Sequence, residues 1–189
     1  YETNLRTGKK KLLYRNKTVD IAYAHVDDEG AVYGARFLEG GYPASVYFKG
    51  KNKTKERRKI LSSKFPGSTI SVTALSDDET KATVSIRSDV NPGIFILYNF
   101  ETNDITPLGK SWGSIDYQNL TPMEPISFPA KDGTTIYGYL TKSRKGDSKN
   151  SPTIVHPHGG PDGVQDTWGF DPFVQMLSSE GFNVLQVNF

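Results

Sequence analysis

Two adjacent glycines, set between a predicted strand and a predicted helix, are the residues of this sequence best suited to catalysis. They lie in the tetrapeptide His158-Gly159-Gly160-Pro161. Because glycine has no Cβ, the main chain can approach a ligand closely there and present a backbone N–H to it. Such an N–H stabilises the negative charge that develops on a carbonyl oxygen during acyl transfer, and losing one donor costs about 2.7–4 kcal/mol. We interpret the tetrapeptide as an oxyanion-hole loop, with a simple tight turn as the alternative.

The other groups that acyl transfer requires are expected to lie outside this chain. No serine is followed three positions later by a lysine, so the Ser-x-x-Lys pattern is unmatched. His156 and His158 are not expected to act as the catalytic base. His25 is expected to be structural. The nucleophile, acid and base are thus predicted to be absent from residues 1–189, and the fragment alone is predicted to be inactive.

Composition argues against several other functions. The chain has no cysteine, and its three histidines form no His-Glu-x-x-His motif, so we expect neither a metal site nor a cofactor. Its 23 lysines and arginines nearly balance 21 aspartates and glutamates, which gives no broad field for nucleic acid or a membrane surface. No apolar stretch approaches the roughly 20 residues of a membrane span. A soluble protein is expected, in the cytoplasm, in the periplasm or secreted.

The elements around the glycine loop predict a βαβ unit. Residues 153–156 form a short apolar strand that leads into the loop. Four apolar residues then follow helical spacing, namely Phe170, Phe173, Val174 and Leu177. Gly181 is expected to end this helix. Residues 182–187 are predicted to form a second buried strand, and a strand, helix, strand sequence indicates an α/β domain with a parallel sheet.

Two further local patterns border this unit. Residues 126–140 are typical of a β-hairpin around the Asp132-Gly133 turn. Three aspartates follow the glycines, namely Asp162, Asp166 and Asp171, and we expect them to cap the helix or form turns before it.

An internal repeat of about 50 residues occupies the first part of the chain. Residues 21–36 align with 71–86 through a shared Asp-Asp-Glu turn flanked by β-rich runs. Third strands are expected at residues 43–48 and 92–97, and fourth strands at 59–61 and 104–108. The basic run at residues 49–59 is then predicted to be a solvated hairpin loop. Residues 1–4 also echo residues 100–103, which suggests the end of a third unit and a chain that is cut at both ends.

Four short antiparallel strands that recur in this way are typical of β-propeller blades. Two blades cannot close a ring, so further blades are expected upstream. The predicted fold is therefore mixed: the C-terminal blades of a β-propeller, followed by the first strands and helix of an α/β-hydrolase domain. A small antiparallel sandwich or open sheet remains the alternative for the repeat.

Three segments resemble the start of the catalytic domain in the prolyl oligopeptidase family of serine peptidases. These are residues 126–133, 155–161 and 181–188, and the likeness is greatest to the acylaminoacyl-peptidase and dipeptidyl-aminopeptidase-like branch. The resemblance implies propeller blades in residues 1–121 and a peptidase domain that begins at residue 122. It also implies that the propeller restricts substrates to short peptides.

Carried over residue by residue, the resemblance matches Gly159 to the oxyanion-hole glycine of the family, while Gly160 shapes the same turn. His158 stands where some branches carry a tyrosine that stabilises the oxyanion through its hydroxyl, so a backbone donor is the better expectation here.

We therefore expect part of a serine peptidase that acts on short peptides. An esterase or lipase with an added β domain, and a non-catalytic propeller that binds peptides, are the alternatives. The expected partners are a peptide substrate and a polypeptide that covers the C-terminal strand, either the rest of the enzyme or another copy in an oligomer.

Overall fold

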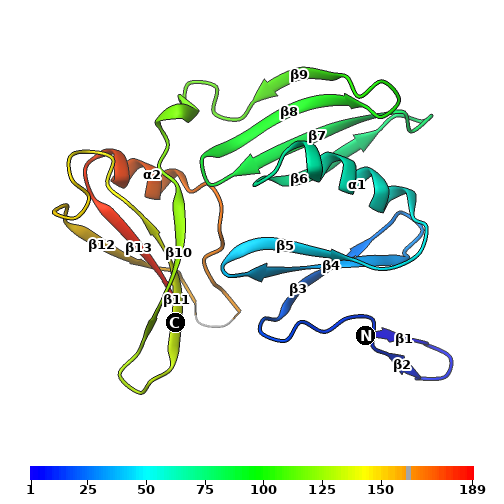
Figure 1. Cartoon of the computed structure of the whole chain (residues 1–189), viewed down its shortest axis with the longest axis horizontal. Coiled ribbons are helices and arrows are strands. Elements are labelled where there is room, and N and C mark those ends of the chain that lie inside the picture. The colour runs from blue at the N-terminus through cyan, green and yellow to red at the C-terminus, as the bar shows by residue number, and fades with distance from the viewer. Residues whose placement is uncertain (161–162) are drawn as a thin grey trace. The chain divides into compact units, whose positions relative to one another are not determined.

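The chain folds into two compact units, Tyr1–Glu56 and Arg57–Phe189 (Figure 1). The computed structural model describes residues 1–160 and 163–189. The boundary between the units lies inside helix α1 (Lys53–Lys64). Each unit is described below by itself.

The first unit is a three-stranded antiparallel sheet with a short hairpin before it. The hairpin pairs β1 (Glu2–Thr3) with β2 (Lys10–Lys11), and the sheet has the order β3 (Ile21–Val26), β4 (Val32–Glu39), β5 (Tyr42–Tyr47). His25 is buried on β3, where its ring packs against the rings of Tyr33 and Tyr47, which also contact each other, and its Nε2 lies 3.0 Å from the Ser45 hydroxyl. The histidine thus has the structural role expected from the sequence.

The second unit begins with a four-stranded antiparallel sheet in sequence order. Its strands are β6 (Thr69–Leu75), β7 (Lys81–Ser88), β8 (Asn91–Asn99) and β9 (Ile105–Lys110). Apolar residues that alternate along the two central strands, such as Val84 and Ile96, form one buried cluster with Leu61 of α1. Alternation with a period of two thus places these apolar side chains on the buried face of the sheet.

The interpretation of the basic run as a loop is wrong. Residues 49–59 do not form a hairpin loop and residues 59–61 are not a strand, because helix α1 occupies most of this segment. Lysine, arginine and glutamate are good helix formers, and the side chain of Asn52 caps the first turn by accepting the Lys55 amide at 2.8 Å. Leu61, which is fully buried, anchors the charged helix to the sheet.

The repeated acidic turns are built alike but differ by one residue. In the first copy the Asp27 carbonyl accepts the Gly30 amide, and in the second the Ser76 carbonyl accepts the Glu79 amide. Asp27 thus corresponds to Ser76, one position away from the alignment suggested by the shared Asp-Asp-Glu letters. The left-handed backbone at this point, φ 83° at Gly30 and 55° at Glu79, explains why glycine is suitable in the first copy.

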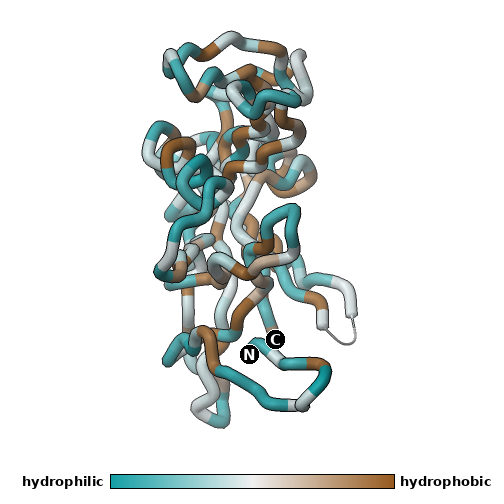
Figure 2. Tube along the Cα trace, turned by 90° about the vertical axis from the view of Figure 1, so that its right-hand side faces the viewer, coloured by the Kyte–Doolittle hydropathy of each residue, from teal (hydrophilic) through white to brown (hydrophobic). Residues whose placement is uncertain are grey.

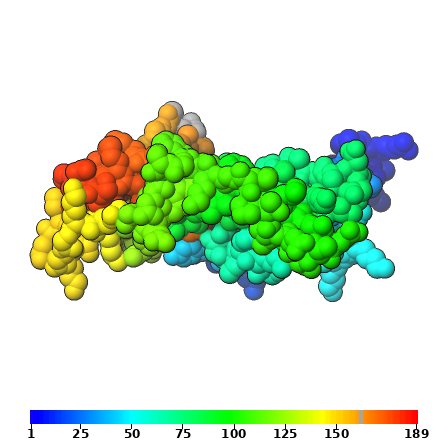
Figure 3. Space-filling view, turned by 90° about the horizontal axis from the view of Figure 1, so that it is seen from above, coloured from blue at the N-terminus to red at the C-terminus, as the bar shows by residue number. Residues whose placement is uncertain are grey.

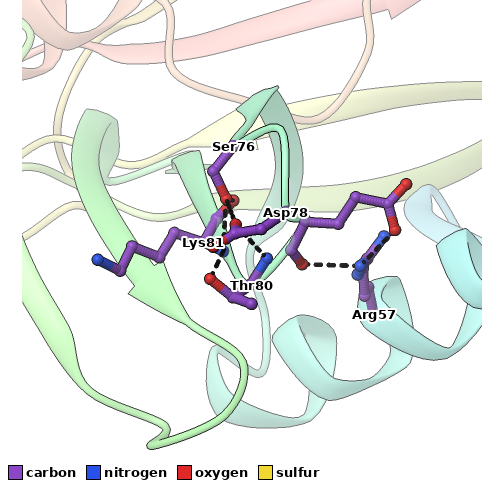
Figure 4. Close-up of polar contacts among 6 residues, drawn as sticks. Arg57, Ser76, Asp78, Thr80 and Lys81 are labelled. Atoms are coloured by element: carbon purple, nitrogen blue, oxygen red, sulfur yellow. Dashed lines mark hydrogen bonds and ion pairs between the residues drawn. The ribbon is translucent and has the colours of Figure 1, made fainter.

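The second of these turns is fixed by side chains (Figure 4). The Ser76 hydroxyl and the Thr80 amide and hydroxyl donate to Asp78, and these hydrogen bonds lower the pKa of Asp78 to about 2. Arg57 of α1 reaches the same turn and donates to the carbonyl and carboxylate of Glu79 at 2.7 and 2.9 Å. The ion pair therefore ties the helix to the hairpin between β6 and β7.

A second repeated turn links β1 to β2 and β8 to β9. Asn4 accepts the amides two and three residues ahead of it, and Asn99 does the same. The turns end on Gly8 and Asn103, with φ of 67° and 62°. The two turns are thus a structural repeat, but the register suggested by the sequence echo is wrong: Asn4 corresponds to Asn99, and Gly8 corresponds to Asn103.

The remaining sheet contains the glycine loop. Its strands are β10 (Met123–Pro129), β11 (Thr135–Thr141), β12 (Thr153–Pro157) and β13 (Asn183–Asn188), in the order β10-β11-β13-β12. A short 3-10 helix η1 (Tyr117–Asn119) precedes it, and α2 (Pro172–Ser179) joins β12 to β13. The predicted hairpin and βαβ unit are both confirmed. The sheet is mixed rather than wholly parallel, because β11 pairs antiparallel with β13 while β12 pairs parallel with it.

The surface of this part includes exposed apolar side chains, among them Tyr137, Val155 and Phe189. The loop between β11 and β12 stands out as the protruding yellow segment of Figure 3. Hydrophobic stretches are short and are interrupted by hydrophilic ones along the trace (Figure 2). In the part of the chain that the structure describes, no helix is long and apolar enough to cross a bilayer.

The role of α1 is tested by a matched pair of truncations. Leu61→Ala removes a side chain that is 0% exposed, and we expect the free energy of unfolding to fall by about 2–5 kcal/mol. Ile60→Ala, at a neighbouring side chain that is 40% exposed, is expected to change it by less than about 1 kcal/mol. Urea unfolding measures both, and equal effects of the two variants would contradict the observed orientation of α1.

Candidate active site

The glycine loop lies where the two parallel strands of the last sheet end. Register pairs run from Thr153 with Asn183 to Pro157 with Val187, so the carboxyl ends of β12 and β13 meet. His158 follows β12 and Phe189 follows β13, and their rings stack with centroids 4.6 Å apart and an interplanar angle of 3°. Ligands of open α/β sheets bind in the crevice at the carboxyl ends of such strands.

The two glycines leave open space beside the main chain. Gly159 and Gly160 are exposed, and a Cβ built on either would meet no described atom within 4 Å. Neither has a positive φ. Gly138 on β11 is different, because a Cβ there would come within 2.2 Å of the Gln186 carbonyl oxygen. Neither packing nor backbone conformation within the described residues thus requires glycine at positions 159 and 160.

The amides of these two glycines are also available. In residues 1–160 and 163–189, neither N–H donates to an acceptor. An exposed loop with two adjacent N–H groups that donate to no described acceptor can bind an anionic oxygen.

His158 orients the peptide between the glycines. Its Nδ1 lies 2.6 Å from the carbonyl oxygen of Gly159, and because that oxygen can only accept, Nδ1 carries the donated proton. A trans peptide points its C=O and N–H in opposite directions. Holding the Gly159 carbonyl against the imidazole therefore turns the Gly160 N–H away from it. The Nε2 atom of the ring is buried and has no partner among the described residues.

The other residues singled out in the sequence are distributed around this loop. Pro161 and Asp162 lie outside the described residues. His156, on β12, packs against the ring of Phe173 at 5.3 Å and takes no part in the glycine loop's hydrogen bonds. Asp171 caps α2 as expected, accepting the amides of Phe173 and Val174 at 2.8 and 3.0 Å.

The buried face of α2 differs from the apolar face predicted for it. Val174 is 1% exposed, as expected, but Phe173 is 48% exposed. Two polar residues are buried in its place, Gln175 and Ser178.

Hydrogen bonds explain why Gln175 and Ser178 are buried instead of Phe173. The Gln175 amide accepts from the Thr121 N–H at 2.9 Å and donates to its carbonyl at 2.7 Å. The Ser178 hydroxyl is 2.7 Å from the Lys142 carbonyl. The helix that follows the glycine loop thus holds the segment that enters the sheet, and no apolar periodicity could have shown it.

The expectation that residues 1–189 contain no Gly-x-Ser-x-Gly pentapeptide is wrong, because Gly109-Lys110-Ser111-Trp112-Gly113 matches this pattern. A nucleophile elbow requires a strand, a sharp turn and a helix that exposes the serine hydroxyl. Ser111 instead follows β9, the antiparallel edge strand of the first sheet of its unit, and its amide continues that pairing by donating to Gly93. Trp112, not the serine, has the left-handed backbone, with φ 54°. The pentapeptide therefore does not form a nucleophile elbow.

No group of histidines and acids suited to a metal ion occurs within residues 1–160 and 163–189. A hollow of about 540 Å³ lies in the first unit, where Leu12, Val32 and Phe48 contribute to its wall. Its lining residues belong to the first unit, whereas the glycine loop belongs to the second.

No protein-family model matches the chain. Dipeptidyl aminopeptidase BIII of Pseudoxanthomonas mexicana is 28% identical over 131 residues, which cover 66% of this chain and 19% of that protein. This chain therefore spans about a fifth of the relative's length.

Solved structures share the fold. A structure from a study of two prolyl endopeptidases matches with a TM-score of 0.65 at 14% identity, over 98% of this chain and 27% of the other. Dipeptidyl peptidase 4 of Porphyromonas gingivalis matches with a TM-score of 0.58 at 14% identity, over 98% of this chain and 26% of the other. The likeness to the prolyl oligopeptidase family is thus confirmed: this chain shares the fold of peptidases of that family and is related in sequence to a dipeptidyl aminopeptidase.

Proposed function

We propose that this chain is part of a serine peptidase of the prolyl oligopeptidase family that hydrolyses short peptides through an acyl-serine intermediate. The proposal rests on one observation, that the amides of Gly159 and Gly160, at the carboxyl ends of parallel strands, donate to no acceptor among the described residues. The acylaminoacyl-peptidase and dipeptidyl-aminopeptidase-like branch fits best, because one relative in sequence is a dipeptidyl aminopeptidase.

In the proposed reaction, a serine hydroxyl outside residues 1–189 attacks the peptide carbonyl carbon while a histidine, also outside them, accepts its proton. The π electrons of the carbonyl move onto its oxygen, and a backbone N–H of the glycine loop stabilises that charge. The amine leaves with a proton from the histidine, and water then hydrolyses the acyl-serine. The resemblance points to Gly159 as the donor, but the geometry favours Gly160, because His158 holds the Gly159 carbonyl on the opposite side of the peptide.

The domain organisation proposed from the sequence accompanies this function. The four-stranded sheet β6 to β9 and the repeated turns support propeller blades in residues 1–121. The strand order β10-β11-β13-β12 with its βαβ unit supports the start of an α/β-hydrolase domain in residues 122–189. In this proposal the blades restrict access to short peptides.

The sequence predicts a polypeptide that covers the C-terminal strand, but β13 lies between β11 and β12, so both of its edges are already paired. We propose that a neighbouring polypeptide instead covers β12, one of the two edge strands of this sheet, on which Val155 is 60% exposed. An edge strand with exposed apolar side chains is prone to pair with further chain. The rest of the enzyme, or another copy, would fill this place.

The activity of the complete enzyme tests the proposal. We expect it to hydrolyse chromogenic aminoacyl or dipeptidyl amides and to lose this activity on reaction with a serine-directed fluorophosphonate. Residues 1–189 alone are expected to show no turnover, because they lack the attacking group. Selective hydrolysis of simple esters would favour an esterase, and peptide binding without turnover would favour a non-catalytic propeller; either result would overturn the proposal.

His158→Ala tests the orientation of the glycine peptide. Loss of the Nδ1–H bond to Gly159 frees the peptide to rotate, and we expect kcat of the complete enzyme to fall by about 10- to 100-fold. KM should change little, because the oxyanion forms only in the transition state. His156→Ala is the matched control, since this histidine contacts Phe173 instead. Equal kinetics of the two variants would contradict the assigned role of His158.

A further inference from the structure

The side chain of Asn188 binds both backbone groups of one residue in the loop that follows the glycines. Its Oδ1 accepts the Asp166 N–H at 2.8 Å, and its Nδ2 donates to the Asp166 carbonyl at 3.0 Å. This pair of hydrogen bonds reproduces the exchange between neighbouring residues of an antiparallel sheet. Asn188 is the last residue of β13, so the loop is attached directly to the end of the central strand.

Two consecutive residues at the end of β13, Asn188 and Phe189, therefore hold the two ends of the segment that runs from His158 to Asp166. Phe189 stacks on His158, where the loop begins, and Asn188 binds Asp166, where it returns to the sheet. The parallel pairing of β12 with β13 makes this possible, because it brings the carboxyl ends of both strands to the same edge. The free amides of the glycines lie between these two attachments.

The loop stays close to the sheet beyond Asp166. The indole N–H of Trp168 donates to the Met123 carbonyl at 3.1 Å. Burial raises the pKa of the Tyr139 phenol, and the nearby Asp166 carboxylate adds to this rise. Tyr139 is itself buried on β11, so Asp166 lies over the sheet rather than in solvent.

From these contacts we infer that Asn188 is a positioning residue, which fixes the returning end of the glycine loop and so sets the place of its amides. This inference rests on the proposed function. Asparagine suits the role because its short amide carries an acceptor and a donor side by side, whereas aspartate cannot donate and glutamine is longer by one carbon.

Asn188→Ala in the complete enzyme tests the inference. We expect kcat to fall by about 10- to 100-fold, because small displacements of catalytic groups cost that much, while KM stays within about threefold. Amide hydrogen exchange in residues 163–168 should become faster than in the unchanged protein. Asn188→Asp keeps the shape and the acceptor but loses the donor, and it should lower kcat in the same direction.

Asn183→Ala is the matched control, at the same residue type on the opposite end of β13. Asn183 accepts the Ser143 amide at 2.8 Å and donates to the Ser148 carbonyl at 2.8 Å, so it organises a different loop. This variant is expected to lower the melting temperature without changing kcat of the folded enzyme or exchange in residues 163–168.

Two results would overturn the inference. One is an equal loss of kcat in the Asn183 and Asn188 variants, which would indicate a purely structural role. The other is unchanged exchange in residues 163–168 when Asn188 is replaced, which would show that it does not hold the loop. If the unchanged enzyme does not hydrolyse peptides at all, the proposed function fails, while the exchange measurement still decides whether Asn188 holds the loop.

Discussion

The parallel pairing of β12 with β13 is the constraint on which the rest of the candidate site depends. It brings the carboxyl ends of two strands together, so that His158 meets Phe189 and Asp166 meets Asn188. A parallel connection requires a crossover, and α2 supplies it at the correct length because Asp171 caps the start of this helix. The glycines thus lie in the part of the crossover between two contacts, that of His158 with Phe189 and that of Asp166 with Asn188.

The order of elements in this region could be predicted from the sequence, because hydrophobic periodicity and turn residues report on local structure. The Asp132-Gly133 hairpin, the strand before the glycines and the helix after them lie where the patterns place them. The face of α2 could not be predicted in the same way. Gln175 is buried because its partner is Thr121, far away in the sequence, and no local pattern contains that information.

Charge patterning misled the interpretation of α1 for a related reason. A run of lysines and arginines is typical of a solvated loop, but the same residues favour a helix once a cap and one buried anchor are present. Asn52 provides the cap and Leu61 the anchor. The Gly-x-Ser-x-Gly match around Ser111 shows that a sequence motif alone is not sufficient. Without the strand, sharp turn and helix of a nucleophile elbow, the serine is not a nucleophile.

The central claim is that the glycine loop binds the oxyanion through the Gly160 amide. A structure of the complete enzyme with its serine bound covalently to a boronate or phosphonate peptide analogue tests it most directly. The account predicts the Gly160 nitrogen about 2.7–3.1 Å from the oxygen that replaces the carbonyl oxygen. An adduct oxygen bound only by other donors, with the peptide between Gly159 and Gly160 facing away from it, would contradict the account.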